Sequence, residues 1–202
     1  MLARHLIVCA CALAALALPA AASAKFGQSF RPMPHNPADR LLSVPIDDFR
    51  YDHATRCRKK PAPGALAMQS WLASHSRGVS WGIMRCEKLG PGNYSLHAEG
   101  RAIDWHLDVR NRADRRAAEH LIDLLLAPDR AGNPFALARR MGVQEIIWNC
   151  QAWWGSEAMI KYSLCYDAKD RPKKIDDTSA HRNHVHIGLS RAGAAKRTSF
   201  WR

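Results

Sequence analysis

The chain has few acidic residues, few cysteines and a single long apolar run. Its 202 residues include 18 Asp and Glu against 30 Lys and Arg, so its formal net charge is +12. A chain this basic is suited to acidic partners such as cell-wall polymers, peptide carboxylates or lipid headgroups. It contains no motif typical of RNA or DNA binding, so we expect no nucleic-acid partner. Internal repeats are also absent, which excludes solenoid and propeller architectures.

The one long apolar run lies near the N-terminus, from Leu6 to Leu18. Arg4 precedes it, and Ala22-Ser23-Ala24 follows it with the small residues that signal peptidase prefers. The run is too short for a comfortable membrane span, although an uncleaved anchor is the alternative. We predict a signal peptide over residues 1–24 and a secreted or periplasmic mature protein. After cleavage we expect no stable membrane insertion.

Cysteine usage agrees with export. Two of the six cysteines lie in the predicted signal, and the four that remain are Cys57, Cys86, Cys150 and Cys165. An even number in an oxidising compartment suggests two disulfides. Three pairings are possible, and the sequential one, with bonds Cys57–Cys86 and Cys150–Cys165, is favoured because it is local. A structural zinc site is the alternative, but no C-x-x-C spacing supports it.

The mature chain divides into a proline-rich arm over residues 25–45 and one domain over residues 46–202. Periodicity in the domain predicts helices over 65–72, 115–126 and 135–141, and strands over 79–84, 102–107, 143–148 and 184–189. Residues 149–180 lack a sustained pattern, which is typical of a functional loop that walls a cleft. We therefore predict an α+β fold, with a small antiparallel sheet that carries the site and helices packed on one side.

Two segments carry residues suited to metal chemistry. In the strand over 102–107, alternation places Asp104 on the polar face. In the last strand, His184 and His186 share one face while the apolar residues between them face the core. If the two strands pair, Asp104 and His186 can converge. His97 would then enter from the preceding loop, where Gly100 allows the chain to turn.

Two imidazoles and one carboxylate leave an open fourth position on a tetrahedral zinc ion, which is the arrangement of a catalytic zinc site. The same ligand types can hold iron for oxygen chemistry. However, the spacing of His97 and Asp104 differs from the short His-x-Asp of iron oxygenases, and an exported chain has no obvious electron supply. A lone histidine is usually a structural residue, so the prediction depends on the two segments occurring together.

The paired patterns Ser-x-His-x-x-Gly-x-Ala-x-Asp and His-x-His resemble the metal-binding signature of the LAS metallopeptidases, named after lysostaphin, D-Ala-D-Ala metallopeptidases and sonic hedgehog. Within that group, the strings HAEGRAIDW, GNPFALARRMGVQEIIWN and HRNHVHIGLS resemble a family of secreted bacterial domains regarded as peptidases. The resemblance runs from about residue 51 to about residue 193. It implies that zinc is bound by His97, Asp104 and His186.

The resemblance also implies roles for residues near the last ligand. His184 would lie beside the metal without binding it, and His181 is a candidate base. Asn183 stands where the D-Ala-D-Ala dipeptidases have a glutamate. Since asparagine cannot accept a proton at neutral pH, the dipeptidase mechanism does not transfer simply.

Other residues have two interpretations each. Arg101 could bind a substrate carboxylate through its planar guanidinium group or form a structural salt bridge. Glu99 could support the metal site, act as an alternative base or be a solvated turn residue. Trp148 and Asn149, at a strand end, could border the cleft or pack in the core.

Together these features predict a zinc peptidase or amidase that acts on stem or cross-link peptides of peptidoglycan. The alternative is a non-catalytic module that keeps zinc and binds a wall component or a protein. A binding module needs no base, and the presence of both His181 and His184 favours the enzyme. A basic nuclease built on the last histidine segment lacks the second half of any nuclease motif.

Overall fold

The computed structural model describes residues 30–156 and 158–202, and the predicted signal peptide and the start of the arm lie outside these ranges. The described chain forms an α+β fold around a six-stranded antiparallel sheet, as the sequence predicts. The sheet has the order β1 (Val79–Gly82), β4 (Ala102–His106), β8 (His184–Leu189), β5 (Val143–Trp148), β6 (Gln151–Trp153) and β7 (Ile160–Lys161). A separate hairpin consists of β2 (Lys88–Gly90) and β3 (Asn93–Tyr94).

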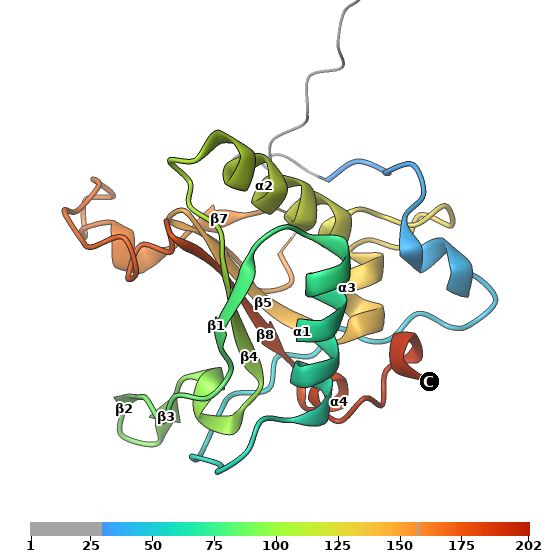
Figure 1. Ribbon diagram of the computed structural model, residues 1–202, viewed down its shortest axis with the longest axis horizontal. Coiled ribbons are helices and arrows are strands. Elements are labelled where there is room, and N and C mark those ends of the chain that lie inside the picture. The colour runs from blue at the N-terminus through green and yellow to red at the C-terminus, as the bar shows by residue number, and fades with distance from the viewer. Residues whose placement is uncertain (1–29, 157) are drawn as a thin grey trace, which may run out of the picture.

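Four α-helices accompany the sheet in the described chain: α1 (Pro63–His75), α2 (Arg112–Leu126), α3 (Ala136–Met141) and α4 (Arg191–Ala194). Short 3-10 helices are η1 (Pro37–Leu41), η2 (Leu96–Glu99), η3 (Ser163–Cys165) and η4 (Ser199–Trp201). The helices α1, α2 and α3 lie on one side of the sheet (Figure 1), with α1 in contact with β4 and α3 with β5. None of the helices in residues 30–156 and 158–202 is long and apolar enough to cross a membrane.

The apolar core lies between the helices and one face of the sheet. The two-residue alternation of β4 and β8 sends Ile103, Trp105, Val185 and Ile187 into this core. On the other side, α2 contributes an apolar face that includes Leu121, Ile122, Leu125 and Leu126, all of them buried. Burial of each such side chain stabilises the fold by roughly 1.5–3 kcal/mol. The opposite sheet face is left for polar residues.

The predicted helices and central strands are present, with local signals that explain their ends. The Asn111 side chain accepts hydrogen bonds from the backbone N–H groups of Ala113 and Asp114 and so caps α2. Gly142 ends α3 in the left-handed conformation, with φ 74°. The strand predicted over residues 79–84 is shorter in the structure, because β1 ends at Gly82. The backbone of Gly82 has a positive φ of 132°, which interrupts the extended conformation.

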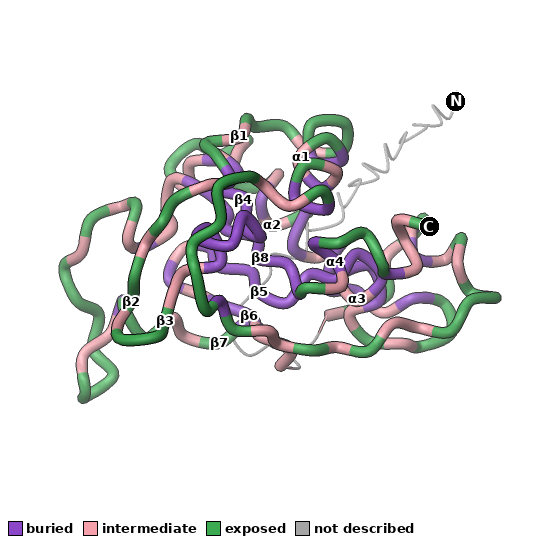
Figure 2. The backbone as a smooth tube through the Cα atoms, turned by 90° about the horizontal axis from the view of Figure 1, so that it is seen from below, coloured by how far each residue is buried: buried purple, intermediate pink, exposed green. Residues whose placement is uncertain are grey.

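The expectation that residues 149–180 lack regular structure is wrong in part, because β6 and β7 extend the sheet there. The β2–β3 hairpin and α4 were also not predicted. These elements have two to four residues each, too few to show an alternation or a helical repeat. The central strands are buried, whereas β2 and β3 are largely exposed (Figure 2).

The structure contains two disulfides, Cys57–Cys86 and Cys150–Cys165, which is the pairing that the sequence favours. The described part of the proline-rich arm packs on the domain. Asn36 caps η1, and the next residue but one, Ala38, is fully buried in the core. Phe30 meets Phe135 edge to face at 6.4 Å between ring centroids.

Candidate metal centre

Strand pairing brings the candidate ligands together. In the antiparallel register of β4 and β8, Asp104 lies directly opposite His186, on the sheet face that the helices leave open. His97 comes from η2, just before β4. Gly100 ends η2 in the left-handed conformation, with φ 66°, and any Cβ there would lie 2.9 Å from the Lys60 carbonyl oxygen. Glycine at this turn therefore lets η2 deliver His97 to the sheet.

The three ligand atoms form a nearly equilateral triangle. Asp104 Oδ1 lies 3.0 Å from His97 Nε2 and 3.0 Å from His186 Nδ1, and the two nitrogens are 3.1 Å apart. All three residues are buried, and they form a group that could hold a metal ion. Donor atoms around a tetrahedral zinc ion, with bonds of about 2.0–2.1 Å, lie about 3.3–3.4 Å apart. The triangle is therefore close to the size that such an ion requires.

The contacts of the outer nitrogens of both imidazoles indicate which inner nitrogens would bind a metal ion. His97 Nδ1 lies 2.8 Å from the Ile83 carbonyl oxygen, which can only accept a hydrogen bond, so this nitrogen donates. His186 Nε2 lies 2.9 Å from a carboxylate oxygen of Glu145, an ion-pair contact that favours a proton on that nitrogen. Without a metal ion, the raised pKa of His186 places a proton on its Nδ1, which donates to Asp104 Oδ1. With a metal ion bound, His97 Nε2 and His186 Nδ1 would present lone pairs beside Asp104 Oδ1, as three ligands of one cation.

Two ionised carboxylates, Asp104 and Glu145, and the guanidinium group of Arg85 surround the imidazole of His186. Burial would raise the pKa of Asp104, but its hydrogen bonds with His186 and His97 hold the pKa far below its usual range. Burial would lower the pKa of His186, but its hydrogen bond with Asp104 and its ion-pair contact with Glu145 raise it to about 9. Glu145 itself keeps a pKa of about 2 despite its burial, chiefly through its contact with His186. In the metal-free protein, protonated His186 and Arg85 balance the two carboxylates, and a metal ion would take the place of the proton between His186 and Asp104.

His186, one of the three ligands, lines a cleft of about 830 Å³. The lining also includes Leu89 and Tyr94 of the β2–β3 hairpin, and Trp154 and Tyr162 from the segment after β5. His181 and His184 line the same cleft. The sequence prediction that the segment after Asn149 walls a cleft agrees with this arrangement.

His184 is held in one orientation beside the triangle. Its Nδ1 lies 2.9 Å from Asn183 Oδ1, while the amide nitrogen of Asn183 donates to the Thr178 hydroxyl at 2.9 Å. This chain of hydrogen bonds places the proton of His184 on Nδ1. Its Nε2 therefore carries a lone pair and lies 3.5 Å from Asp104 Oδ1. Burial lowers the pKa of His184 to about 4, so the ring is neutral at pH 7.

His181 lies next to His184, with 4.7 Å between ring centroids, and its backbone has the left-handed φ of 51°. Its Nδ1 is buried and has no hydrogen-bond partner among the described residues. Burial lowers the pKa of His181 to about 3. A strained, neutral and incompletely paired imidazole in a cleft is typical of a functional residue. Both predicted base candidates thus lie at the centre.

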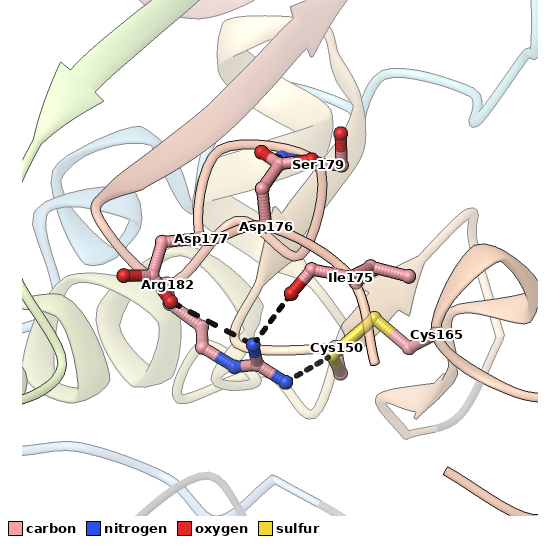
Figure 3. The surroundings of a disulfide bond; sticks show 7 residues. All are labelled: Cys150, Cys165, Ile175, Asp176, Asp177, Ser179 and Arg182. Carbon is pink, nitrogen blue, oxygen red and sulfur yellow. Dashed lines mark hydrogen bonds and ion pairs between the residues drawn. A yellow bond between two sulfur atoms is a disulfide. The ribbon is translucent and has the colours of Figure 1, made fainter. Parts of the chain in front are cut away.

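The second disulfide supports the wall that carries these residues. Arg182, next to His181, reaches across the loop to the Ile175 carbonyl oxygen at 3.4 Å and to the Cys150 sulfur at 3.7 Å (Figure 3). It also contacts Asp177 at 3.6 Å. The disulfide to Cys165 and the Arg182 side chain together fix the loop that leads into β8.

Arg101 and Glu99 form a buried salt bridge at 2.8 Å, away from the cleft. Arg101 also donates to the backbone carbonyls of Leu189 and Asp52, so its guanidinium group is fully engaged. This arrangement fits the structural interpretation of Arg101 and not the substrate-binding one. Glu99 is 2 % exposed and accepts from the Thr55 backbone, so it is not a solvated turn residue, and its carboxylate is held by Thr55 and Arg101.

Two further candidates from the sequence do not line the cleft. Trp148 is buried in the main apolar core, which agrees with its packing interpretation. Asn149 adopts φ 47° at the turn after β5, and its backbone N–H donates to the His181 carbonyl at 2.7 Å. Asn149 therefore supports the position of His181 without facing the cleft.

Two residues at the centre were missed by sequence reasoning. Glu145 contacts His186 from β5, and Arg85 donates to Asp104 Oδ2 at 3.0 Å. Glu145 was detectable in principle, because it is a charged residue inside a strand that is otherwise largely apolar. Arg85 follows the first strand in a stretch without periodicity, and no local pattern marks it.

The fold and the centre define an α+β protein whose antiparallel sheet carries a His–Asp–His group able to hold a metal ion. A family model described as "VldE, C-terminal domain" matches residues 57–185, and the chain belongs to this family. The matched segment includes His97 and Asp104 and ends one residue before His186. Comparisons with curated proteins and with solved structures gave no match.

Proposed function

We propose that this protein is an exported zinc-dependent hydrolase of the LAS type, which cleaves peptide bonds in the stem or cross-link peptides of peptidoglycan. The observation that carries the proposal is the triangle of His97, Asp104 and His186, whose ligand atoms lie 3.0–3.1 Å apart and whose third member lines a cleft. Two imidazoles and one carboxylate leave a coordination position free, as a catalytic zinc ion requires. The two disulfides fit an oxidising compartment outside the cytoplasm.

When bound, zinc would supply a water of lowered pKa and would polarise the carbonyl of the scissile bond. The side chains around the triangle supply the remaining chemistry. His184 presents an unprotonated Nε2 toward the centre and accepts the proton that the attacking water loses, since Asn183 holds its other nitrogen as the donor. His181 is also neutral, with its ring centroid 4.7 Å from that of His184, and serves as the alternative base.

The cleft and the charge of the chain support a polymeric, acidic substrate. Its walls combine aromatic rings with exposed apolar side chains such as Leu89, which suits an extended peptide better than a small polar molecule. The net charge of +12 favours accumulation at an anionic cell wall. Peptidoglycan peptides combine these properties with an extracellular location.

The proposal is tested by digestion of purified peptidoglycan with the metal-free protein, the zinc-loaded protein and the zinc-loaded protein after chelation. New amino termini, detected by labelling and mass spectrometry, are expected with the zinc-loaded protein alone. Asp104→Asn should abolish their release, whereas Asp129→Asn, a buried carboxylate in a remote loop, should not. If the protein binds one zinc ion and releases no amino termini, a non-catalytic wall-binding module replaces the enzyme.

A further inference from the structure

A buried carboxylate stands behind the metal-ligand triangle. Glu145 lies on β5, which pairs with β8, and its neighbour across the strands is Gly188. A Cβ at Gly188 would lie 3.1 Å from the Glu145 Cβ and 2.3 Å from a methyl carbon of Leu96. Glycine at this position therefore leaves room for the Glu145 side chain to turn toward His186.

Both oxygens of this carboxylate are engaged. Oε1 lies 2.9 Å from His186 Nε2. Oε2 accepts hydrogen bonds from the Tyr51 hydroxyl at 2.6 Å and from the Trp154 indole N–H at 2.8 Å. Tyr51 and Trp154 come from segments about a hundred residues apart in the sequence, and both line the cleft.

We infer that Glu145 is the positioning residue of the metal centre and that Tyr51 and Trp154 hold it in place. With a metal ion bound, its Oε1 would hold the remaining proton of His186 on Nε2, so that Nδ1 presents its lone pair to the ion. A carboxylate behind a ligating imidazole fixes the ring and raises its basicity as a ligand. The inference rests on the metal-binding part of the proposed function, and it does not depend on which bond is cleaved.

The surroundings of Glu145 differ from those of a carboxylate that only stabilises the fold. Glu99 shows the latter case in the same protein, because it is buried against the guanidinium group of Arg101. Among the residues that the structure describes, Glu145 is buried without a lysine or arginine partner, and its contacts are one imidazole and two uncharged donors. Its Oε1 is therefore left to the imidazole of His186, as in a residue that orients a metal ligand.

The test compares Glu145→Gln, Glu145→Ala and Tyr51→Phe with the unaltered protein. Zinc affinity is measured by competition with a chromophoric chelator, and the visible absorption of the cobalt-substituted protein reports the ligand geometry. Glu145→Ala should weaken zinc binding by about 10- to 100-fold and shift the cobalt bands. Glu145→Gln should retain part of the affinity, since its amide oxygen can still face His186. Tyr51→Phe should give a smaller loss.

Two controls separate positioning from general destabilisation. Tyr166→Phe removes a phenol hydroxyl outside the cleft, beside the Cys150–Cys165 disulfide, and Asp129→Ala removes a buried carboxylate from a remote loop. Both should leave zinc affinity and the cobalt spectrum unchanged, even where the melting temperature falls. If Glu145→Ala does not fold, Tyr51→Phe and Glu145→Gln carry the test.

The outcomes distinguish this inference from the proposed function. Zinc affinity and cobalt spectra unchanged in every Glu145 and Tyr51 variant that folds would overturn the positioning role alone. An unaltered protein that binds neither zinc nor cobalt would overturn both proposals. Tight zinc binding that depends on Glu145, together with failure to cleave peptidoglycan, would support the positioning role and refute the peptidase.

Discussion

Asp104→Asn is the most direct perturbation of the predicted metal centre. The substitution preserves shape and removes the charge between His97 and His186. If the new amide oxygen faces the two imidazoles, the amide nitrogen meets the guanidinium group of Arg85, which donates to the other carboxylate oxygen at 3.0 Å. If the amide is turned over, its N–H donors point at the triangle and take the place of a cation. Either orientation opposes metal binding.

The size of the effect follows from linkage. For the unaltered protein at a free zinc concentration 100 times the dissociation constant, binding stabilises the fold by about 2.7 kcal/mol. Removal of a residue that only hydrogen-bonds a metal ligand weakens metal binding by up to about 100-fold. Loss of a charged ligand itself should weaken zinc binding by at least that factor. At the same zinc concentration the stabilisation then falls to about 0.4 kcal/mol. For a domain of this size, the zinc-induced rise in melting temperature should fall from about 5–11 °C to about 1–2 °C.

The assay is thermal unfolding with and without zinc at pH 7, and the quantity compared is the zinc-induced shift. The melting temperature of the metal-free variant is not a suitable measure. The pKa of Asp104 is lower in the folded protein than in the unfolded chain, so its charge stabilises the metal-free fold at pH 7 as well. Asp129→Asn is the control, with an unchanged zinc shift. A full zinc shift in Asp104→Asn would refute the assignment of this carboxylate as a ligand.

Three further predictions follow from individual side chains. His184→Gln should leave zinc affinity intact and lower the rate of peptide cleavage by about 10²- to 10⁴-fold, as the loss of a general base does; an unchanged rate would remove His184 from the chemistry. Burial raises the pKa of Asp123 in α2 from 3.8 to about 7, so its ionisation destabilises the fold as the pH rises through that window. Asp123→Asn should therefore raise the free energy of unfolding at pH 8 by about 1 kcal/mol, a value reduced for solvent screening, and raise the melting temperature with it. At pH 3 the aspartic acid and the asparagine are both neutral, so the melting temperature should be unchanged. Replacing Cys150 and Cys165 by serine should cost about 3 kcal/mol, given the separation of 15 residues, without loss of zinc affinity, as measured by denaturant unfolding and chelator competition.

The parts of the site that lie on two regular strands could be predicted from the sequence. Side chains in a strand alternate between faces, so the position of each residue in β4 and β8 determines whether it meets the helices or the open face. Once Asp104 and His186 are placed on the open face, antiparallel pairing is enough to bring them together, and the structure has them in direct register. The same alternation predicts the core, where Ile103 faces Ile187.

The parts that depend on contacts between distant segments could not be predicted in the same way. Glu145 is recognisable as a charged residue in an apolar strand, but only the sheet order places β5 next to β8 and its carboxylate against His186. Tyr51 lies in a segment without regular structure, and nothing local indicates that its hydroxyl reaches β5. Arg101 shows the converse case, because a residue type suited to substrate binding is held by Glu99 and by two backbone carbonyls.

The structure separates the metal ligands from the cleft walls, and the two disulfides fall on different sides of that division. Cys150–Cys165 lies in the wall after β5, and its segment contributes none of the three ligands. Cys57–Cys86 lies beside η2, where the backbone N–H of Arg58 donates to the Ala98 carbonyl and that of Arg85 to the His97 carbonyl. Loss of Cys150–Cys165 should therefore change the cleft and leave metal binding intact. Loss of Cys57–Cys86 should loosen the backbone that positions His97. The central strands, paired on both sides, hold Asp104 and His186 in either case, because their positions depend on the sheet and not on the loops.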